Sequence, residues 1–492
     1  MPQGVFLTFP KIVVWTGMCC LLFVLQIFMG TNIIQSILTL IIFFIFPFVI
    51  QSYVKINSVG AYVVGATFIK LFIVSQWLKV AFLQAADTNL EEPFLTVVFL
   101  LQGLVGLWVA VFPLWVLTGR RGGVFKPSQN PTFLFQLALF SIALCLFSIV
   151  ARSYLNIDRY GDAESLDGRG FVLFSFLGQM GALAVAAFSV RVHILSGGRR
   201  FVDRYVVAML IFGFFHGIWE NQRTLMLAGF VALAATYLSY GGRVKKGHVA
   251  LVLLAAAFMQ VIVFPVIDIQ RSFLKSRSPT ALQTLESTAD VASNMLNSSE
   301  REEYDDSLDR LYRSWYTRLY YGEPRGFLDR FAPNPFGEAI EHYKNLAPVG
   351  VSHFVGQMSY GVPNLILKPL GIERPIRSTT MMEADIFQSA TNMNYGVFAD
   401  LYASLGGDYF FLGCIIVSVL YFASLHLIYG GFRNNYFAAF GFSTSYFVFA
   451  DSDFAEIVFR ITIQGVMYLI LLMVFTFLVG RDGLSARGVT RA

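Results

Sequence analysis

The chain has 492 residues, of which 56% are hydrophobic and only 14% are charged, and its formal net charge is +5. Soluble domains carry about 25% charged residues, so this composition excludes an ordinary soluble protein. The apolar runs reach the roughly 20 residues that a membrane-spanning helix requires. They are continuous rather than alternating, which excludes a transmembrane β-barrel. We therefore expect an all-α polytopic integral membrane protein, in which excess positive charge reflects topology rather than a nucleic-acid partner.

Twelve apolar stretches are predicted to cross the membrane. They cover about residues 12–30, 33–54, 60–83, 94–118, 133–151, 171–194, 205–219, 224–240, 249–267, 409–429, 436–450 and 458–479. The first stretch lacks a small-residue cleavage pattern, so we expect a retained span rather than a removed signal peptide. The predicted divisions are transmembrane helices 1–9 (1–267), a large loop (268–408), helices 10–12 (409–480) and a tail (481–492).

The short loops carry their Lys and Arg residues unevenly. If the N-terminus is cytoplasmic, sixteen fall on the cytoplasmic side and five on the opposite side. The five are Arg152, Arg159, Arg169, Arg223 and Arg460. Because positive loops stay in the cytoplasm, both termini are predicted to be cytoplasmic. The loop at 268–408 then faces outward, which in a bacterium is the periplasmic side of the inner membrane.

The four cysteines, Cys19, Cys20, Cys145 and Cys414, all lie inside apolar runs at irregular spacing. The spacing predicts no metal site, and the large loop has no cysteine for a disulfide framework. The sequence also has no Gly-rich phosphate loop. We therefore expect no cofactor and no metal.

The large loop is predicted to be mainly helical. Ser278-Pro279 is a helix start signal, and a second helical pattern ends at Gly322. Residues 336–348 predict a further short helix, whereas 350–380 is rich in Gly and Pro and is expected to be irregular. The segment from Asn392 to Asp408 is amphipathic and ends at the pair Gly406-Gly407. It is expected to lie at the outer membrane face before the tenth span begins near Tyr409.

The sequence "HGIWENQRTLML" at 216–227 forms the turn between the seventh and eighth spans. Trp219 suits an interfacial anchor, and Glu220 and Arg223 stand at the edge of the hydrocarbon. A bare arginine there is costly unless it is paired or faces a wet cavity. Two interpretations remain open: Arg223 snorkels to lipid phosphates, or its guanidinium binds a phosphate or pyrophosphate.

Other charged residues are weaker candidates. Arg271, Lys275 and Arg277 follow the ninth span, and two interpretations remain open: ordinary juxtamembrane charge, or a functional set of cations on the outer face. The loop residues able to move protons are Glu338, Glu341, His342, His353, Glu383, Asp385 and Asp400. His353 lies among apolar residues, so a satisfied core histidine is its default role. Lys70 and Lys79 fall within the third span, where each needs a partner or a cavity.

Three stretches resemble the Wzy-type O-antigen and oligosaccharide repeat-unit polymerases, which are relatives of the O-antigen ligases. They are "NQRTLMLAGFVALAATYL" (221–238), "FVGQMSYGVPNLILKPLGIERPIR" (354–377) and "TNMNYGVFADLYASLGGDYFFLGCII" (391–416). The resemblance implies a glycosyltransferase-C-like fold. It also implies metal-independent transfer of a growing glycan from undecaprenyl pyrophosphate to the next lipid-linked unit.

The resemblance also implies site residues. Arg223 matches the family's arginine after the short turn. Arg271 and Arg277 match the family less closely, as loop cations near the membrane. The ligases place a His-Asn pair where this chain has Thr391-Asn392, and the missing His favours polymerase over ligase. The candidate catalytic residues are Arg223, Glu220, His353 and Asp385. The candidate substrate-binding residues are Arg271, Lys275, Arg277, Asn392 and Tyr395.

Alternative functions are an O-antigen ligase and a transporter or flippase of lipid-linked glycan. Transporters usually show internal repeats, which this sequence lacks. A polyprenyl-sugar glycosyltransferase needs acidic residues in its first outer loop, which here is only Thr31-Asn32. The expected partners are the bilayer, an undecaprenyl-pyrophosphate-linked oligosaccharide and a chain-length regulator and flippase of the same pathway.

Overall fold

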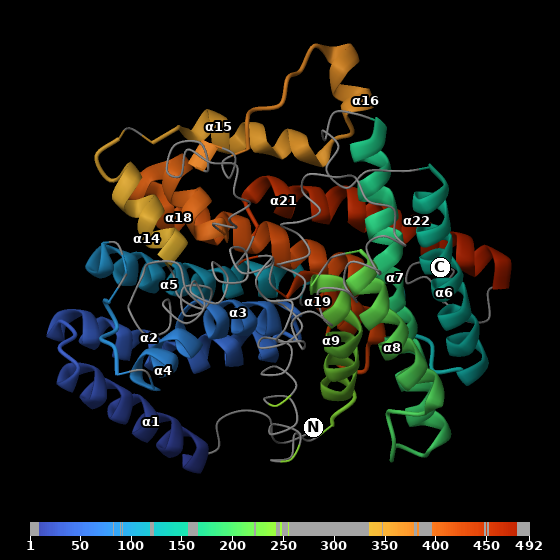
Figure 1. Cartoon of the computed structure of the whole chain (residues 1–492), viewed down its shortest axis with the longest axis horizontal. Coiled ribbons are helices and arrows are strands. Elements are labelled where there is room, and N and C mark those ends of the chain that lie inside the picture. Colours follow the sequence, from blue (N-terminus) through green and yellow to red (C-terminus); the bar gives the residue numbers. More distant parts are fainter. Residues whose placement is uncertain are drawn as a thin grey trace, which may run out of the picture. The chain divides into compact units, whose positions relative to one another are not determined.

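A computed structural model describes residues 9–242, 334–382 and 396–479, together with Gly247 and Leu254. Short gaps fall at 82, 89, 91, 119–122, 156–165, 221–222, 347, 378–380, 447–448 and 450–451. The described residues form helices joined by turns, with no β-strand among them. Figure 1 shows these helices with their labels.

Seven helices within the described part are long and apolar enough to cross a membrane. They cover Ile33–Lys55, Gly60–Ala81, Pro93–Thr118, Pro131–Arg152, Phe174–Leu195, Gly396–Tyr429 and Phe454–Val479. Three shorter apolar helices lie at Val13–Phe28, Arg204–Ile218 and Thr224–Ser239. The chain is therefore a multi-pass helical membrane protein. The predicted ninth span, 249–267, lies outside the described residues apart from Leu254.

The chain divides into two compact units. Unit 1 is Met1–Val124, Ser314–Gly431 and Ser445–Leu472, and unit 2 is Phe125–Arg313, Phe432–Thr444 and Met473–Ala492. The helices of unit 1 are α1 (Phe9–Phe28), α2 (Ile33–Lys55), α3 (Gly60–Phe68), α4 (Val74–Ala81), α5 (Pro93–Thr118), α14 (Asn334–Tyr343), α15 (Val351–Gly356), α16 (Asn364–Leu367), α18 (Gly396–Tyr429) and α21 (Phe454–Phe459). A π-helix, η1 (Ile69–Ile73), joins α3 to α4, and another, η7 (Arg460–Gln464), joins α21 to α22 (Gly465–Val479). Two 3-10 helices, η4 (Gln357–Gly361) and η5 (Lys368–Leu370), lie in the loop region.

Helices α5 and α18 pack closely in unit 1 because glycines on α5 remove side chains from the contact. A Cβ on Gly103 would meet the ring of Phe398 at 2.8 Å, and one on Gly106 would meet Cys414 at 3.1 Å. Phe398 is itself surrounded by the rings of Phe68, Phe336, Phe410 and Phe449. The aromatic core therefore leaves the Phe398 ring little room to move.

Helix α18 breaks at Gly406, where φ is +71° and ψ is 176°. The break lies at the Gly pair where the sequence predicted the amphipathic segment to end. The break frees two carbonyl groups in the part of α18 that precedes Gly406. Residues 349 and 350 of the large loop supply hydrogen-bond donors to these carbonyl groups. The backbone N–H of Val349 donates to Ala403 O (3.1 Å), and that of Gly350 donates to Ser404 O (2.9 Å). The loop is thus fixed to α18 by backbone bonds, and every residue from 396 to 405 is buried.

The predicted short helix in the loop is confirmed as α14. The segment 350–377, predicted to be irregular, contains short helical turns separated by Gly and Pro. Lys79 is buried on α4, and its ammonium group donates to the carbonyls of Ala86 (2.8 Å) and Thr88 (2.7 Å). A buried cation is tolerated there because the carbonyl groups replace its water.

Unit 2 contains α6 (Pro131–Leu155), α7 (Leu166–Leu195), α8 (Arg204–Trp219), α9 (Arg223–Ser239) and most of α19 (Tyr436–Ser445). Helix α7 packs against α6, α8 and α9. The end of α9 is joined to the loop before α19, since Ser239 Oγ donates to Phe432 O and accepts from Asn435 N (3.0 Å). The packing around α7 places α6, α8 and α9 in one bundle.

Replacing Gly103 with Ala should destabilise the protein by about 1–3 kcal/mol, because the added methyl group overpacks the Phe398 ring. The control is Gly17→Ala on α1, where nothing lies within 4 Å of the added Cβ. That change should leave stability unchanged or raise it by up to about 1 kcal/mol through helix propensity. Thermal unfolding of both variants in detergent measures the difference. Equal melting temperatures would contradict the close α5–α18 packing.

Candidate functional site

The first polar cluster lies in unit 2 and consists of Arg152, Glu220, His216 and Cys145; we call it the Arg152 cluster. Arg152 Nη1 donates to Glu220 Oε2, and the two side chains are 13% and 5% exposed. His216 Nε2 lies 3.8 Å from Glu220 Oε1, one helical turn away. Cys145 Sγ lies 3.7 Å from His216 Nδ1 on the other side of the ring. Four groups with polar or ionisable atoms therefore form a buried chain from α6 to the end of α8.

Small residues on α7 make room for this chain. A Cβ on Gly178 would lie 3.0 Å from His216 Cε1, and one on Gly181 would lie 3.7 Å from Cys145 Sγ. The Cys145 thiol donates to Gly178 O at 3.3 Å, so the same glycine also binds the thiol. Phe212 stacks on the imidazole with ring centroids 5.9 Å apart. The imidazole is thus held between a glycine surface and an aromatic ring.

A small pocket adjoins the Arg152 cluster and is lined in part by Cys145, His216 and the side chain of Gln179. Intramembrane ionisable residues that face a cavity commonly mark a pathway or a reaction site. The sequence predicted Glu220 as catalytic and treated Arg152 as an ordinary loop cation. The structure pairs the two side chains, so each buried group has a partner of opposite charge.

The second polar cluster lies in unit 1; we call it the Arg377 cluster, after the arginine at its centre. Arg377 donates through Nε (3.0 Å) and Nη2 (2.8 Å) to the two oxygens of Asp453. Its Nη2 also lies 3.6 Å from Glu456, which in turn accepts from Arg460 Nε at 3.0 Å. Bidentate pairing of this kind fixes both the position and the plane of the guanidinium.

An aromatic ring supports two arginines of this cluster. The guanidinium carbons of Arg374 and Arg377 lie 5.0 and 6.0 Å from the ring centroid of Tyr360. The Tyr360 hydroxyl donates to Pro375 O at 2.9 Å, which holds the ring in place. Arg374 also donates to Val362 O. Arg374 and Arg377 were not predicted as site residues, although both lie in "GIERPIR" within a stretch that carries the family resemblance.

Electrostatics keep Arg377 charged. Burial alone would lower the pKa of its guanidinium, but the charge of Asp453 and the hydrogen bonds to it outweigh burial and raise this pKa above its ordinary value. The negative charge of Glu456 acts in the same direction. Arg377 is therefore cationic at every physiological pH.

Asp400 is fully buried beside this cluster and accepts hydrogen bonds from side chains and from the backbone. Its donors include Gln357 Nε2 (3.3 Å), Ser404 Oγ (3.0 Å) and the backbone N–H of Phe454 (2.7 Å). These bonds join α18 to the loop and to the first residue of α21. Asp400, one of the seven loop residues considered for proton transfer, therefore has a positioning role at the start of α21.

The remaining candidates are only partly described. His353 is half-buried on α15, and its neighbour Phe354 stacks on Phe454 with centroids 4.4 Å apart. Glu341 is exposed and bonds Lys344 (2.5 Å), which also bonds Glu92. Arg223 begins α9, but its side chain lies outside the described residues. Arg271, Lys275, Arg277, Glu383, Asp385, Asn392 and Tyr395 also lie outside them.

Within the described part of the chain, no three His, Cys, Asp or Glu side chains are placed to hold a metal ion. What the two clusters offer instead is fixed guanidinium groups: Arg152 in unit 2, and Arg374, Arg377 and Arg460 in unit 1. Guanidinium groups in partly dry surroundings bind phosphate and carboxylate groups strongly.

Removing one member of the Arg152–Glu220 pair should cost about 3–5 kcal/mol, because the remaining charge stays buried without its partner. We expect Arg152→Met and Glu220→Leu to destabilise the protein singly, and the double variant to recover most of the loss. The exposed Arg204→Met is the control, and it should change stability by less than about 0.5 kcal/mol. Unfolding in detergent gives the coupling energy. Additive effects of the single changes would show that the two side chains do not interact.

Asp453 should contribute to the stability of the protein both by capping α21 and through its ion pair with Arg377. Asp453→Ala removes the bonds to Glu456 N and Arg377 and should cost about 2–4 kcal/mol, whereas Asp453→Asn keeps a cap acceptor and should cost about half as much. Asp203 caps α8 by accepting from Tyr205 N and Val206 N, and Asp203→Ala should cost only about 1 kcal/mol. Melting temperatures rank the three variants. Equal losses for Asp453→Ala and Asp203→Ala would refute the contribution of the ion pair.

No family model, curated protein or solved structure matches this chain. The function must therefore be argued from the residues of the chain itself. Those with the most distinctive chemistry are the two clusters above, one in each unit.

Proposed function

We propose that this chain is a membrane glycosyltransferase that polymerises a bacterial surface polysaccharide. In this reaction a hydroxyl group of one lipid-linked repeat unit attacks the anomeric carbon of the growing glycan. The bond from that carbon to undecaprenyl pyrophosphate breaks, and the attacking hydroxyl gives its proton to a base. The twelve-span, glycosyltransferase-C-like arrangement, the inner membrane location and the outward-facing loop belong to the same proposal.

The observation that carries the proposal is a contact between two stretches that resemble the Wzy-type polymerases. Gln357, in the stretch 354–377, donates to Asp400, in the stretch 391–416. The first stretch ends at Arg377, which is fixed by Asp453. The residues of the resemblance are thus neighbours in space although they are 43 positions apart.

The chemistry of the Arg377 cluster suits such a substrate. An aromatic ring beside fixed guanidinium groups offers an apolar face for a sugar ring and cations for a phosphate. The departing pyrophosphate gains negative charge, and cations already in place stabilise it without reorganisation. Arg223, Arg271, Lys275 and Arg277 remain predicted pyrophosphate ligands, and His353 and Asp385 remain predicted proton acceptors.

Arg223→Ala and Arg374→Ala in the native host should shorten the surface glycan. Loss of one positioned cation typically lowers a rate by about 10²–10³-fold, so long chains should disappear while single-repeat material persists. Arg199→Ala removes an exposed cation of the same type and serves as the control. Gel profiles of the glycan, with protein levels checked by immunoblot, give the result.

The same experiment separates the alternatives. Unchanged chain length with normal protein levels would remove the substituted arginine from the mechanism. Accumulation of free lipid-linked polymer, with attachment alone lost, would identify a ligase. Transport of lipid-linked glycan by the purified protein in vesicles, without polymer formation, would replace the enzyme with a flippase.

A further inference from the structure

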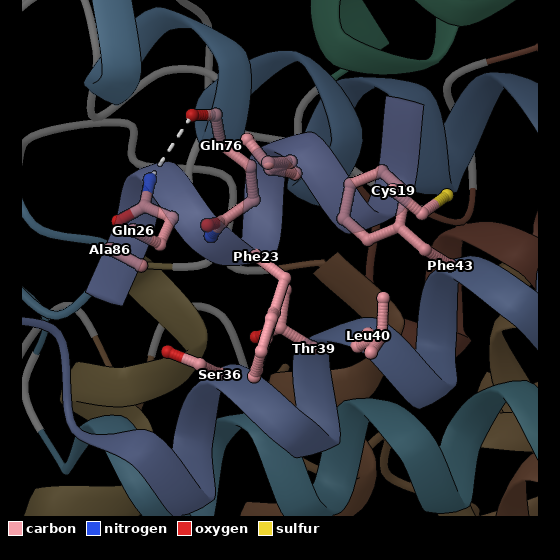
Figure 2. Close-up of a pocket in the computed structure, with 10 residues that line it drawn as sticks. Cys19, Phe23, Gln26, Ser36, Thr39, Leu40, Phe43, Gln76 and Ala86 are labelled. Carbon is pink, nitrogen blue, oxygen red and sulfur yellow. Dashed lines mark hydrogen bonds between the residues drawn. The ribbon is translucent and has the colours of Figure 1, made fainter. Parts of the chain in front are cut away.

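The spans of unit 1 show how a lipid-facing helix is built in this protein. On α2, Thr39 and Phe43 line the small space between α1, α2 and α4 (Figure 2). On the opposite side of α2, Ile37 and Ile41 are exposed and are also apolar. A helix that is apolar almost all round is enclosed by protein or by a membrane. Apolar side chains on the outside of a helix therefore mark lipid contact on a span, and outside the spans they indicate an interaction surface.

The large loop contains a short helix with the same character, although it lies outside the spans. In α15 and the start of η4, Val351, Val355 and Met358 follow one another at i, i+4 and i+7, so they share one face. Their side chains are 56%, 53% and 44% exposed. The opposite face carries Phe354 and Gln357, which are buried. A surface helix of a soluble domain is polar on its outer face, whereas the outer face of this one is apolar.

The chain after η4 adds four exposed apolar side chains: Ile366, Leu370, Ile372 and Ile376. The backbone N–H of Ile372 donates to Leu367 O at 3.1 Å, so the chain turns back after α16. Pro375 then lies against α15 and η4. A Cβ on Gly356 would meet the Pro375 ring at 3.3 Å, and the Tyr360 hydroxyl donates to Pro375 O. We call these four side chains, together with Val351, Val355 and Met358, the apolar loop surface.

Backbone hydrogen bonds hold α15 at the place where α18 enters the membrane. Val349 and Gly350, directly before α15, donate to the carbonyl groups of Ala403 and Ser404. These carbonyl groups lie just before the break at Gly406, and the part of α18 after the break is long enough to cross the hydrocarbon. Helix α15 itself packs against α18 (Figure 1).

The 3-10 helix η4 lies against the first turns of the last span, Phe454–Val479. A Cβ on Gly361 would lie 2.9 Å from both Val458 Cγ1 and Thr462 Oγ1. Thr462 precedes the end of that span by about 25 Å of helix. Because the hydrocarbon of a bilayer is about 30 Å thick, η4 stands at its edge on the side of the large loop. The apolar loop surface therefore lies at the level where the spans enter the membrane.

The charged residues of this stretch match the phosphate layer of a bilayer. Between positions 351 and 377 they are Lys368, Glu373, Arg374 and Arg377. Cations outnumber carboxylates, as expected where a segment meets anionic phosphate groups. Lys368 is exposed, and a lysine can bury its carbon chain while its ammonium group reaches the phosphates. Tyr360 is half-buried, and tyrosine is enriched at this boundary.

We propose that the apolar loop surface lies in the lipid bilayer, in the leaflet nearest the large loop. Its apolar side chains enter the hydrocarbon, and Lys368 reaches back to the lipid phosphates. Residues 349–377 are then an anchor that enters the membrane from one side without crossing it. Arg374 and Arg377 belong to the same stretch, so both stand beside the phosphate layer. This placement holds whether or not the chain polymerises a glycan.

The first test uses the unaltered full-length protein in nanodiscs of a phospholipid whose acyl chain carries a diazirine. Trypsin releases residues 345–377 as one peptide, because Lys368 and Arg374 each precede a proline and resist cleavage. After irradiation, this peptide should carry about tenfold more label than the peptide 331–344, the ratio that transfer of one large apolar side chain into hydrocarbon gives. The peptide 331–344 is the control because the described apolar side chains of α14 are buried. Equal labelling of the two peptides would overturn the proposal.

Spin labels on introduced cysteines then measure depth in the same nanodiscs. The background is Cys20→Ala, since the other three cysteines are buried. Labels at Val355→Cys and Ile376→Cys should collide often with oxygen, which concentrates in lipid, and rarely with a water-soluble nickel chelate. Glu341→Cys on the exposed side of α14 is the matched control and should show the reverse. A label at Lys368→Cys should give an intermediate value, as expected at the phosphate layer.

The same labels reveal any other occupant of the surface. A label at Val355→Cys that the nickel chelate reaches as often as it reaches Glu341→Cys lies in water, which contradicts the proposal. A label that neither oxygen nor the chelate reaches is covered by protein, which also contradicts it. Mass photometry of the nanodiscs then shows whether the covering protein is a second copy of this chain, because a dimer doubles the protein mass.

Discussion

Two buried carboxylates fix the start of α21, and the Arg377 cluster depends on them. Asp453 caps the helix by accepting from Glu456 N, and Asp400 accepts from Phe454 N. The first amides of a helix have no partner within it and carry partial positive charge, so they stabilise a carboxylate there. Asp453 also binds the guanidinium of Arg377, so the helix start, the arginine and the Tyr360 ring form one connected arrangement.

Both polar clusters follow the same physical constraint. A charge inside apolar surroundings must be paired, and the pair must also be hydrogen-bonded to offset the lost water. Arg152 meets this condition through Glu220, the buried Asp453 through Arg377, and Lys79 through backbone carbonyls. Each pair fixes a side chain that would otherwise sample many rotamers. The rigid cations that result are what recognition of a phosphate requires.

Much of the helical pattern could be predicted from hydropathy, and the reason is the bilayer itself. Apolar length marks a span, so α2, α5 and α6 begin and end within a few residues of their predicted positions. Gly406-Gly407 marked the break in α18, because a glycine tolerates a positive φ. The helix α14 was predicted from its pattern alone. Residues 268–333 of the large loop lie outside the described residues, and the helices predicted there are untested.

The partners of the charged side chains could not be predicted in this way. Arg152 and Glu220 are 68 positions apart, and Arg377 and Asp453 are 76 apart, so no local pattern joins them. The π-helix before Gln76 also has no simple sequence signature. "ADSDF" does contain a cap signal at Asp453, which could have identified the start of α21 but not its arginine.

The break at Gly406 also lets the two parts of α18 meet different requirements. The part after the break must match the thickness of the membrane, and the part before it must pack within the protein. Thirty-four residues of unbroken helix would extend about 51 Å, whereas the hydrocarbon of a bilayer is about 30 Å thick. The part after the break is about 35 Å long, which matches that thickness with a modest tilt. The first half is therefore released from matching the membrane and is enclosed by protein instead. It can carry Asp400 and Ser404, and its geometry does not change with the thickness of the lipid around it.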